Sequence, residues 1–437
     1  MSRMRSRFSE RLPEERAKLI NRLGAMSHPL EGADHLDPLL ARIGEARYVL
    51  LGEASHGTSE YYTWRHQISE RLIREKRFSF IAVEGDWPDC DRVNRYVKGA
   101  PDSGRTAREV LHAFDRWPTW MWANEEVVAL AEWLRRHNDP LPKERKVGFY
   151  GLDVYSLWDS MNAVIRYLER VDPPAARMAR QAYGCFEPYG EDVQAYARAT
   201  AFVPTSCEGE VITMLSMLRH KIPADPTDRE AVFNAEQNAL VAKNAEHYYR
   251  TMIQGGAASW NIRDRHMVDT LERLMAFHGP DAKAIVWEHN THIGDARATN
   301  MGRAGMINAG QLVRERHLPD ELVLIGFGSH RGSVIAASEW GAPMQRMPVP
   351  PAEEASFEAI FHQIRAQNQL FVFTEGARSD ETLLKRRGHR AIGVVYDPGQ
   401  ERYGNYVPTA SAPLRRFCLH RREPSAPSAS HRGARRG

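Results

Sequence analysis

The chain has 437 residues, of which 42% are hydrophobic and 26% charged, and its 31 glycines and 25 prolines are too few for a collagenous or low-complexity protein. Its four widely separated cysteines exclude a disulfide scaffold and a CxxC zinc module, and no apolar run approaches the ~18–20 residues of a membrane helix or resembles a secretory signal. The net charge of +3 comes from the C-terminal end, where seven arginines and one glutamate occur from Arg415 onward, so the acidic remainder excludes nucleic acid as an expected partner. We therefore expect a cytoplasmic globular protein of one large or two modest domains, without a membrane partner.

Short β-rich apolar runs recur along the chain: Tyr48–Leu51, Phe80–Val83, Val147–Tyr150, Ala284–Trp287, Leu322–Ile325, Leu370–Phe373 and Ile392–Val395. Runs that are apolar on both sides, without alternation, are typical of strands buried on both faces of a parallel sheet. Helical patterns such as Ser59–Lys76 and Asn124–Asn138 fall between them. We therefore predict an α/β fold with a central, largely parallel sheet flanked by helices.

The stretch from about 155 to 278 breaks this alternation, because it is long, mostly helical in pattern and interrupted by prolines. We predict that it forms a helical insertion over the cleft of the α/β domain. Three parts are expected along the chain: an N-terminal helical segment (1–45), the α/β domain with its insertion (46–410), and a basic C-terminal segment (411–437). The last is rich in Ser, Pro, Ala and Arg, a composition that predicts no fixed structure.

The residues that follow each predicted strand are the first candidates for chemistry, because ligands of α/β sheets bind beyond the carboxyl ends of the strands. Carboxylates or histidines follow four of these strands: Glu53 and His56, then Glu84, then Asp153, and finally Glu288, His289 and His292. The carboxyl ends of parallel strands meet at one edge of the sheet. We therefore expect these side chains to converge on a single cleft.

His56 lies just ahead of a predicted helix whose N-cap is Thr58. The positive end of the helix dipole disfavours imidazolium there, so we expect a neutral His56 that accepts a proton. Glu53 would hold the ring, as a carboxylate orients a catalytic histidine. The alternative is that both residues only cap the helix and satisfy loop amides. The histidines at the other strand end, His289 and His292, favour catalysis.

Arg65 lies two turns inside that helix, where an ion pair on a solvated face is the ordinary role of an arginine. Glu84 ends a buried strand, so we expect its carboxylate to be partly buried and either paired, with Arg65 as the candidate partner, or raised in pKa. Three tryptophans fall within six residues, at Trp117, Trp120 and Trp122. Core packing is the favoured role of this cluster, and lining an apolar pocket is the alternative.

Three longer phrases carry a family resemblance: LGEASHGTSEYYTWR (51–65), AVEGDWPDCDRVNRYV (82–97) and VWEHNTHIGDARATNMG (286–302). Together they resemble the erythromycin esterase family, and the likeness extends from about Ala46 to Pro408. The resemblance implies an α/β sheet with a helical part over the cleft. It also implies a metal-independent hydrolase of ester or lactone bonds that uses no cofactor and acts on a small-molecule substrate.

On the matching positions, the resemblance implies that His56 is the general base and Glu53 its neighbouring carboxylate. The remaining polar residues of the family's cleft match Arg65, Glu84, His289 and His292. Macrolide cleavage, which gives bacteria antibiotic resistance, belongs to some branches of the family, so the resemblance leaves the ester unnamed.

Two positions depart from the family pattern. Glu288 stands where a small residue is expected, and its carboxylate would either raise the pKa of His289 or point into the sheet. The usual acidic and apolar closing segment is replaced after Pro408 by the Arg-rich segment. The last element of the fold is therefore expected to be missing or replaced.

A metal-dependent hydrolase is the first alternative, since five residues offer enough nitrogen and oxygen ligands for zinc or manganese: Glu53, His56, Glu84, His289 and His292. No His-Glu-x-x-His motif or cysteine pair fixes a coordination geometry. We therefore expect no metal.

Three further alternatives concern other residues. Ser55 as a nucleophile lacks the Gly-x-Ser-x-Gly motif, and the adjacent His56 cannot easily reach its hydroxyl. The Gly326–Gly332 segment mimics a dinucleotide fingerprint without a second βαβ half, so we expect it to shape a loop at the cleft with His330 facing inward. A non-enzymatic protein that binds haem or another apolar ligand beside the Trp-rich segment stays open by analogy of fold.

Overall fold

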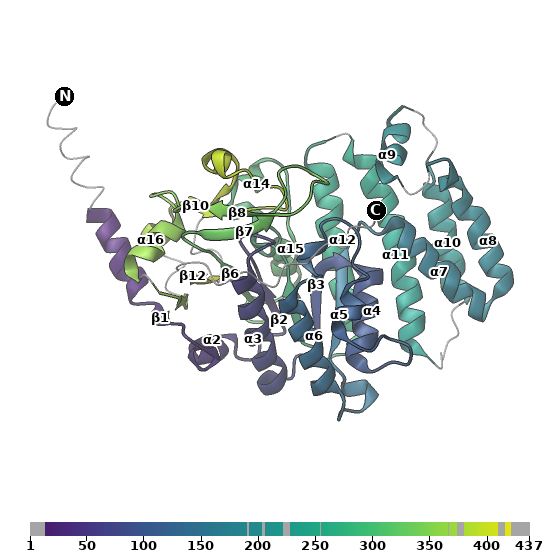
Figure 1. The fold of residues 1–437 in the computed structure, drawn as a ribbon, viewed down its shortest axis with the longest axis horizontal. Helices are drawn as coiled ribbons and strands as arrows, with labels where there is room; N and C mark the ends of the chain where they lie inside the picture. Colours follow the sequence, from purple (N-terminus) through teal and green to yellow (C-terminus); the bar gives the residue numbers. More distant parts are fainter. Residues whose placement is uncertain are drawn as a thin grey trace, which may run out of the picture.

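The computed structural model describes residues 14–189, 192–202, 206–221, 228–253, 255–365, 367–373, 380–409 and 416–420. Its central sheet is built from β1 (Ser27–Pro29), β2 (Tyr48–Leu51), β3 (Phe80–Asp86), β4 (Gly148–Asp153), β5 (Ala284–Trp287), β6 (Leu322–Phe327), β9 (Gln369–Phe371) and β12 (Arg416–His420). The strand order is β1-β9-β12-β6-β2-β5-β3-β4 (Figure 1). Strands β6, β2, β5, β3 and β4 run parallel, and β12 adds a parallel neighbour to β6. The predicted α/β fold with a largely parallel sheet is confirmed.

Helices cover both faces of the sheet, which explains why the strands are apolar without alternation. Val49 and Leu51 of β2 belong to one hydrophobic cluster, and Leu50 between them belongs to another. The first cluster packs against α2 (Asp37–Ile43), α3 (Ser59–Lys76), α4 (Trp87–Lys98), α5 (Ala107–Leu111) and α6 (Glu125–Asn138). The second packs against α12 (Ala257–His278), α13 (Asn290–Ile293) and α15 (Ala309–Arg316).

The stretch predicted as a helical insertion contains α7 (Leu157–Val171), α8 (Pro173–Tyr183), α9 (Val193–Phe202), α10 (Glu208–Lys221) and α11 (Arg229–Met252), followed by α12. Helices α7 to α11 lie beyond the β4 edge of the sheet, on the right in Figure 1, and share a hydrophobic cluster of their own. Helix α12 instead packs on β4 and contributes to the main core. None of the described helices is both long enough and apolar enough to cross a bilayer.

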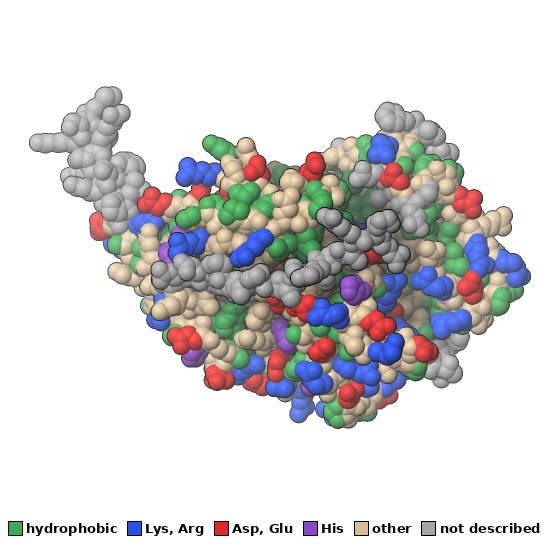
Figure 2. Space-filling model, viewed as in Figure 1, with side chains coloured by type: hydrophobic (Ala, Val, Ile, Leu, Met, Phe, Trp, Pro, Cys, Tyr) green, Lys and Arg blue, Asp and Glu red, His purple; other side chains and the backbone are tan. Residues whose placement is uncertain are grey.

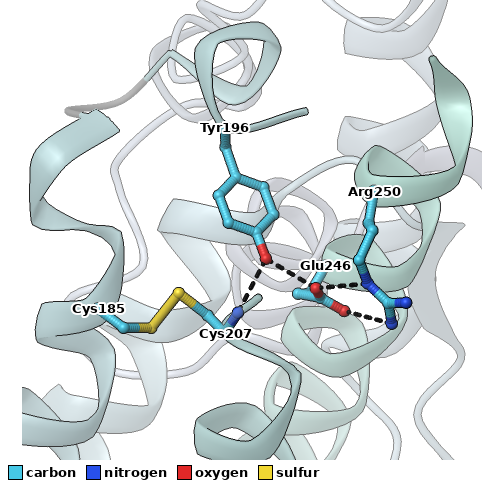
Figure 3. The surroundings of a disulfide bond; sticks show 5 residues. All are labelled: Cys185, Tyr196, Cys207, Glu246 and Arg250. Atoms are coloured by element: carbon cyan, nitrogen blue, oxygen red, sulfur yellow. Dashed lines mark hydrogen bonds and ion pairs between the residues drawn. A yellow bond between two sulfur atoms is a disulfide. The ribbon is translucent and has the colours of Figure 1, made fainter. Parts of the chain in front are cut away.

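A disulfide joins Cys185 to Cys207 inside this insertion (Figure 3). Beside it, the Tyr196 hydroxyl accepts a hydrogen bond from the Cys207 amide at 3.0 Å and donates one to Glu246 at 2.7 Å. Glu246, on α11, also pairs with Arg250 at 2.9 Å. The bond and this network tie the start of α10 to α11. Disulfides persist in oxidising compartments, so the predicted reducing cytoplasm does not account for this bond.

Replacing both Cys185 and Cys207 by serine is expected to lower the free energy of unfolding by about 3 kcal/mol, because the bond closes a loop with a sequence separation of 22. Urea unfolding followed by far-UV circular dichroism measures the loss. Wild-type protein treated with dithiothreitol is the control and should lose the same amount. If neither reduction nor replacement moves the unfolding midpoint, the bond does not stabilise the insertion.

The C-terminal part differs from two sequence predictions. Ile392–Val395 is not a strand, since it makes only isolated bridges, Ser55 with Ile392 and Ala337 with Val395. The strand that extends the sheet is β12, which pairs with β6 and β9, so the prediction of no fixed structure is wrong for 416–420. A short apolar run within the basic composition supplies this strand. The rest of 411–437 lies outside the described residues.

Two two-stranded antiparallel sheets lie outside the central sheet. They are β7 (Gly332–Ala336) with β8 (Gln345–Val349), and β10 (Arg387–Arg390) with β11 (Tyr406–Thr409). The segment Gly326–Gly332 joins β6 to β7 and is not followed by a helix. This arrangement fits the expected role of the segment as a loop. A dinucleotide fingerprint needs a helix at that point. Its His330 stacks on His362 with ring centroids 4.0 Å apart instead of facing the cleft.

Candidate active site

A cavity of about 560 Å³ opens at the carboxyl edge of the parallel strands, and we call it the cleft. Side chains from four strand ends and from α12 meet in its wall: His56, Glu84, Asp86, Asp153, Arg263, His289 and His292. Of the six residues predicted for the site, the cleft wall contains four, whereas Glu53 and Arg65 lie behind His56. The convergence of separate strand ends follows from the parallel topology.

His56 is held from behind by a chain of two charged residues. Its Nδ1 lies 2.9 Å from Oε1 of Glu53, and the other carboxylate oxygen of Glu53 accepts a hydrogen bond from Nη2 of Arg65 at 2.9 Å. A carboxylate at Nδ1 places the ring proton there and leaves Nε2 as the free, basic nitrogen. The hydrogen bonds that run from Arg65 through Glu53 to His56 therefore end in a basic nitrogen at the cleft.

Arg65 is fully buried, so its alternative role in an ion pair on a solvated face is wrong. Its guanidinium lies 4.4 Å from the ring centre of Tyr62 and 4.7 Å from that of Trp287. These aromatic faces replace water around the cation, which allows an arginine two turns inside α3 to point into the core. Because Arg65 does not reach the cleft wall, it acts on the site through Glu53.

Replacing Arg65 by methionine is expected to lower kcat roughly tenfold to 100-fold, since a charge-assisted hydrogen bond contributes about 1.5–3 kcal/mol to holding its partner. Removing the cation also leaves Glu53 without its ion-pair partner behind His56. A positioning role through Glu53 predicts a loss in kcat with little change in KM. A merely structural role would lower the melting temperature without this selective loss, so steady-state kinetics and the melting temperature together distinguish the two.

The loops that carry these residues are locked together by Asn290. Its backbone amide donates to the carbonyl of Glu53 at 2.8 Å, and its side chain donates to the carbonyl of Phe327 at 2.7 Å. A Cβ at Gly52 would lie 2.1 Å from Oδ1 of Asn290. Only glycine at position 52 allows this close approach of the β2 and β5 loops.

Glu84 pairs with Arg263 rather than with Arg65, which corrects the predicted partner. Its Oε1 accepts a hydrogen bond from Nη2 of Arg263 at 2.7 Å, and its Oε2 accepts one from the backbone amide of His289 at 2.8 Å. Burial by itself would raise the pKa of Glu84, but the charges of His292 and Arg263 outweigh it and hold this pKa well below its usual range. Glu84 is therefore a carboxylate in the cleft wall.

Arg263, on α12, is the site residue that sequence reasoning missed. Besides Glu84, it binds Asp153 through Nε at 2.9 Å and Nη2 at 2.6 Å, a bidentate pair. Its remaining nitrogen, Nη1, lies 2.9 Å from Nε2 of His292. The sequence around Arg263 gives no local sign of this role, because nothing in a helix far along the chain shows that it reaches a strand end.

His292 lies between Arg263 and Asp264. Nδ1 is 3.0 Å from Oδ1 of Asp264, and since an arginine can only donate, Nε2 must accept from Arg263. Its ring stacks on Trp260 with centroids 4.4 Å apart. Burial lowers the pKa of His292, but Asp264 and Glu84 outweigh this and raise it above its ordinary value. The carboxylates of Asp264 and Glu84 therefore favour a charged His292 ring, whereas its contact with Arg263 favours a neutral one.

His289 has the opposite electrostatics. Burial and the neighbouring His56 lower the pKa of His289 well below its usual range, so its ring is neutral. Nδ1 lies 2.8 Å from Oγ1 of Thr291 and accepts from the Thr291 amide, which leaves the proton on Nε2. That Nε2 is buried with no hydrogen-bond partner among the described residues. The rings of His289 and His56 are 4.9 Å apart.

Glu288 points away from the cleft into the core. It is 1% exposed, and its Oε2 has no hydrogen-bond partner in the described part of the chain. Burial, with added repulsion from Glu84 and Asp264, raises the pKa of Glu288 well above its usual range. Of the two expected roles for this residue, pointing into the sheet is the one observed. A neutral carboxyl group is the form that such burial tolerates.

The Trp-rich segment serves both expected roles. Trp120 and Trp122 are buried, and Trp122 also lines the cleft and donates through Nε1 to the carbonyl of Glu84 at 3.1 Å. Ser55, in contrast, makes a hydrogen bond with the Thr58 hydroxyl and lines a small separate cavity. This position does not favour the serine-nucleophile alternative.

Within the part of the chain that the structure describes, most of the nitrogen and oxygen atoms that would bind a metal are engaged in hydrogen bonds, Nε2 of His56 and Nε2 of His289 excepted. Nδ1 of His56 faces Glu53, both ring nitrogens of His292 face other side chains, and Arg263 occupies the space between Glu84 and His292. Across the described ranges, no group of three or more His, Cys, Asp or Glu side chains is arranged to hold a metal ion.

Comparisons with known proteins show the family to which the chain belongs. Residues 73–418 match the family model described as Erythromycin esterase, a span that begins after Arg65. Erythromycin esterase type II of Escherichia coli is 21% identical over 380 residues, which cover 81% of this chain and 87% of that protein. The putative hydrolase YbfO of Bacillus subtilis (strain 168) is 21% identical over 389 residues, covering 83% and 79% respectively.

Solved structures share the fold at low identity. A Bacillus cereus protein has a TM-score of 0.75 at 19% identity, and a succinoglycan biosynthesis protein has 0.73 at 22%, each covering 93% of this chain and 97% of that chain. An erythromycin esterase mutant in its open conformation has a TM-score of 0.66 at 16% identity, covering 92% and 96%. Since the family model spans most of the sequence, this chain belongs to the erythromycin esterase family, a membership that supports a hydrolase.

Proposed function

We propose that the protein hydrolyses an ester or lactone bond by attack of a water molecule that His56 activates. The proposal depends on the hydrogen bonds that join Arg65 to Glu53 and Glu53 to His56. They leave a basic nitrogen of His56 at the cleft, next to the ring of His289. A histidine whose other nitrogen is held by a carboxylate is the usual general base of hydrolases.

In the first step, Nε2 of His56 removes a proton from water as the water oxygen attacks the carbonyl carbon. The π bond of the carbonyl opens, and a tetrahedral oxyanion forms. Glu53 holds the ring in its tautomer and stabilises the imidazolium that results. Arg65 holds Glu53 in place from the core.

The oxyanion needs a donor that is already oriented toward it. Nε2–H of His289 is our candidate for this donor, because His289 lines the cleft beside His56 and its other ring nitrogen is engaged with Thr291. Its Nε2 has no hydrogen-bond partner among the described residues. A buried donor without a partner gains more from a developing negative charge than one that is already paired. His289 is therefore assigned to the oxyanion.

The second step breaks the bond to the leaving oxygen. The tetrahedral intermediate collapses, the carbonyl re-forms, and the leaving alcohol oxygen takes a proton from the imidazolium of His56. His292, whose two ring nitrogens face Asp264 and Arg263, holds Arg263 in place on the same wall. The products are a carboxylic acid and an alcohol, or a single hydroxy acid from a lactone.

The substrate class is tested with a panel of alkyl and aryl esters, small lactones and macrolide lactones. Hydrolysis is read as the gain of one water in mass, or as the separate acid and alcohol. Erythromycin belongs in the panel because the Escherichia coli relative is an erythromycin esterase. The intact mass of the protein during turnover is followed as well. A stable acyl adduct would contradict direct attack by water, and a panel without any product would overturn the proposed function.

A further inference from the structure

Two exposed aromatic side chains stand at the mouth of the cleft. Trp340, between β7 and β8, is 65% exposed, and Tyr403, in α18 (Glu401–Gly404), is 87% exposed, yet both line the cleft. Hydrophobic side chains gather over β7 and β8 on the face shown in Figure 2. Large apolar side chains exposed at a concave site are typical of ligand-binding surfaces. We call Trp340 and Tyr403 the aromatic rim.

The indole of Trp340 is supported from behind. The ring of Trp117 lies against it, with centroids 4.5 Å apart. Nε1 of Trp117 donates to the carbonyl of Ala342 at 3.0 Å, which fastens the loop that carries Trp340. The face of Trp340 is therefore presented as a fixed platform rather than on a free loop.

Asp86 and Asp89 form an acidic wall in the same cleft. Asp86 is 6% exposed; its Oδ2 pairs with Arg116, whereas its Oδ1 is buried without a hydrogen-bond partner among the residues that the structure describes. Burial and the charge of Asp86 raise the pKa of Asp89 to about 7. An unpaired buried acceptor is costly in a folded protein, so Oδ1 of Asp86 is suited to a donor that enters with a ligand.

The aromatic rim and the acidic wall belong to one surface. Arg116 pairs with Asp86, and the next residue, Trp117, packs on Trp340. A single short segment thus links the wall to the platform. Pro118, Met121 and Trp122 continue the lining of the cleft between them.

We propose that the aromatic rim and the acidic wall form a subsite for a saccharide ring carried by the substrate. The apolar C–H face of a sugar stacks on the indole of Trp340, while its hydroxyl groups donate to Asp86 and Asp89. As a statement about the substrate, this inference rests on the proposed function. Saccharide binding itself requires no hydrolysis and is measured separately.

A neutral polyol suits this surface better than other ligands of the same size. Arg116 already balances the negative charge of Asp86, so this carboxylate does not need a cation from the ligand. Among the described residues, its Oδ1 lacks only a hydrogen-bond donor. Asp89 takes up a proton near neutral pH, and a carboxyl group in that range both donates and accepts, as a hydroxyl requires. A purely apolar ligand would leave Oδ1 of Asp86 unpaired.

The test is isothermal titration calorimetry with a panel of neutral trisaccharides of glucose, galactose, mannose and xylose, none of which contains an ester. At least one is expected to bind wild-type protein at millimolar concentration. Trp340→Ala should weaken that binding roughly tenfold, because a stacked aromatic face contributes beyond its buried area. Leu318→Ala is the matched control, since Leu318 is also 65% exposed and lies outside the cleft, and it should leave binding unchanged.

Variants of Asp89 show whether the subsite binds the hydroxyl group of a saccharide or a cation. Asp89→Asn keeps hydrogen-bonding atoms without the charge and should retain saccharide binding within about threefold, whereas Asp89→Leu should lose it roughly tenfold. Tetramethylammonium chloride is titrated as the competing probe. Tetramethylammonium binding that Asp89→Asn abolishes, with no trisaccharide bound, would overturn the inference in favour of a cation subsite.

The two proposals fail separately. If wild-type protein hydrolyses esters but binds none of the trisaccharides, or binds them equally after Trp340→Ala, the saccharide subsite is wrong and the proposed function stands. If a trisaccharide binds with the expected dependence on Trp340 and no ester is cleaved, the subsite stands and the hydrolytic assignment is wrong.

Discussion

Replacing His56 by alanine is expected to lower kcat by about 10²–10⁴-fold, the range that a general base contributes. The imidazole removed is the one whose Nδ1 lies 2.9 Å from Glu53 and whose ring faces His289 across 4.9 Å. KM should change little, because the base acts on water rather than on the bound substrate. Steady-state kinetics on any ester that the wild-type enzyme cleaves measures the effect.

His35→Ala is the matched control, because His35 is an exposed histidine outside the cleft. Its kcat should equal that of the wild-type enzyme. Added imidazole should restore part of the activity of His56→Ala, since the vacated space adjoins Glu53, and should leave His35→Ala unaffected. A folded His56→Ala variant with wild-type kcat would show that another group activates the nucleophile.

Replacing Arg263 by methionine is expected to lower the free energy of unfolding at pH 7.5 by about 3–5 kcal/mol, the cost of removing one partner from a buried ion pair. Glu84 and Asp153, both buried, would then lack the guanidinium that binds them at 2.6–2.9 Å. Urea unfolding measures the loss. Arg316→Met removes an exposed pair with Asp269 and should cost no more than about 1 kcal/mol.

The pH dependence of the Arg263→Met effect follows from the same contacts. In the wild-type protein the pKa values of Glu84 and Asp153 are lowered, so their stabilisation is present above the unfolded pKa of about 4 and is lost as pH falls through the folded value. Without Arg263, burial raises the pKa of Asp153, and Glu84 keeps only the histidine charges and the His289 amide to oppose its burial. Protonation at lower pH then relieves the unpaired carboxylates. The difference from wild type should therefore shrink between pH 7.5 and pH 5. A difference that stays constant with pH would show that Arg263 stabilises by packing alone.

Local sequence patterns predicted most of the parallel core. The runs at 48–51, 80–83, 284–287 and 322–325 all lie in strands, because burial on both faces demands continuous apolar residues. Helix α3 begins and ends as predicted, at Ser59 and Lys76. Ile392–Val395 has the same composition but makes only isolated bridges, since neighbours above the sheet decide whether such a run joins a ladder.

The partners of the site residues were not predictable in the same way. The sequence favoured a surface position for Arg65, because nothing in the pattern of α3 shows that Tyr62 and Trp287 flank its guanidinium. Arg263 carried no signal of its own, since it reaches Glu84 and Asp153 only through the packing of α12 on β4. The contacts of Arg263 join residues more than 100 positions apart, and a local sequence pattern cannot indicate contacts over such a distance.

By itself, the sequence determined the layered α/β architecture and the edge at which Glu53, His56, Glu84, His289 and His292 meet. The physical reason is that strand burial and parallel topology follow from local composition and from chain order. Only the tertiary structure decided the charge pairing: Glu53 with Arg65, and Glu84 with Arg263. Electrostatic pairing depends on distance in space and on exclusion of water, so the protonation states of His289 and His292 were fixed only when the helices closed over the sheet.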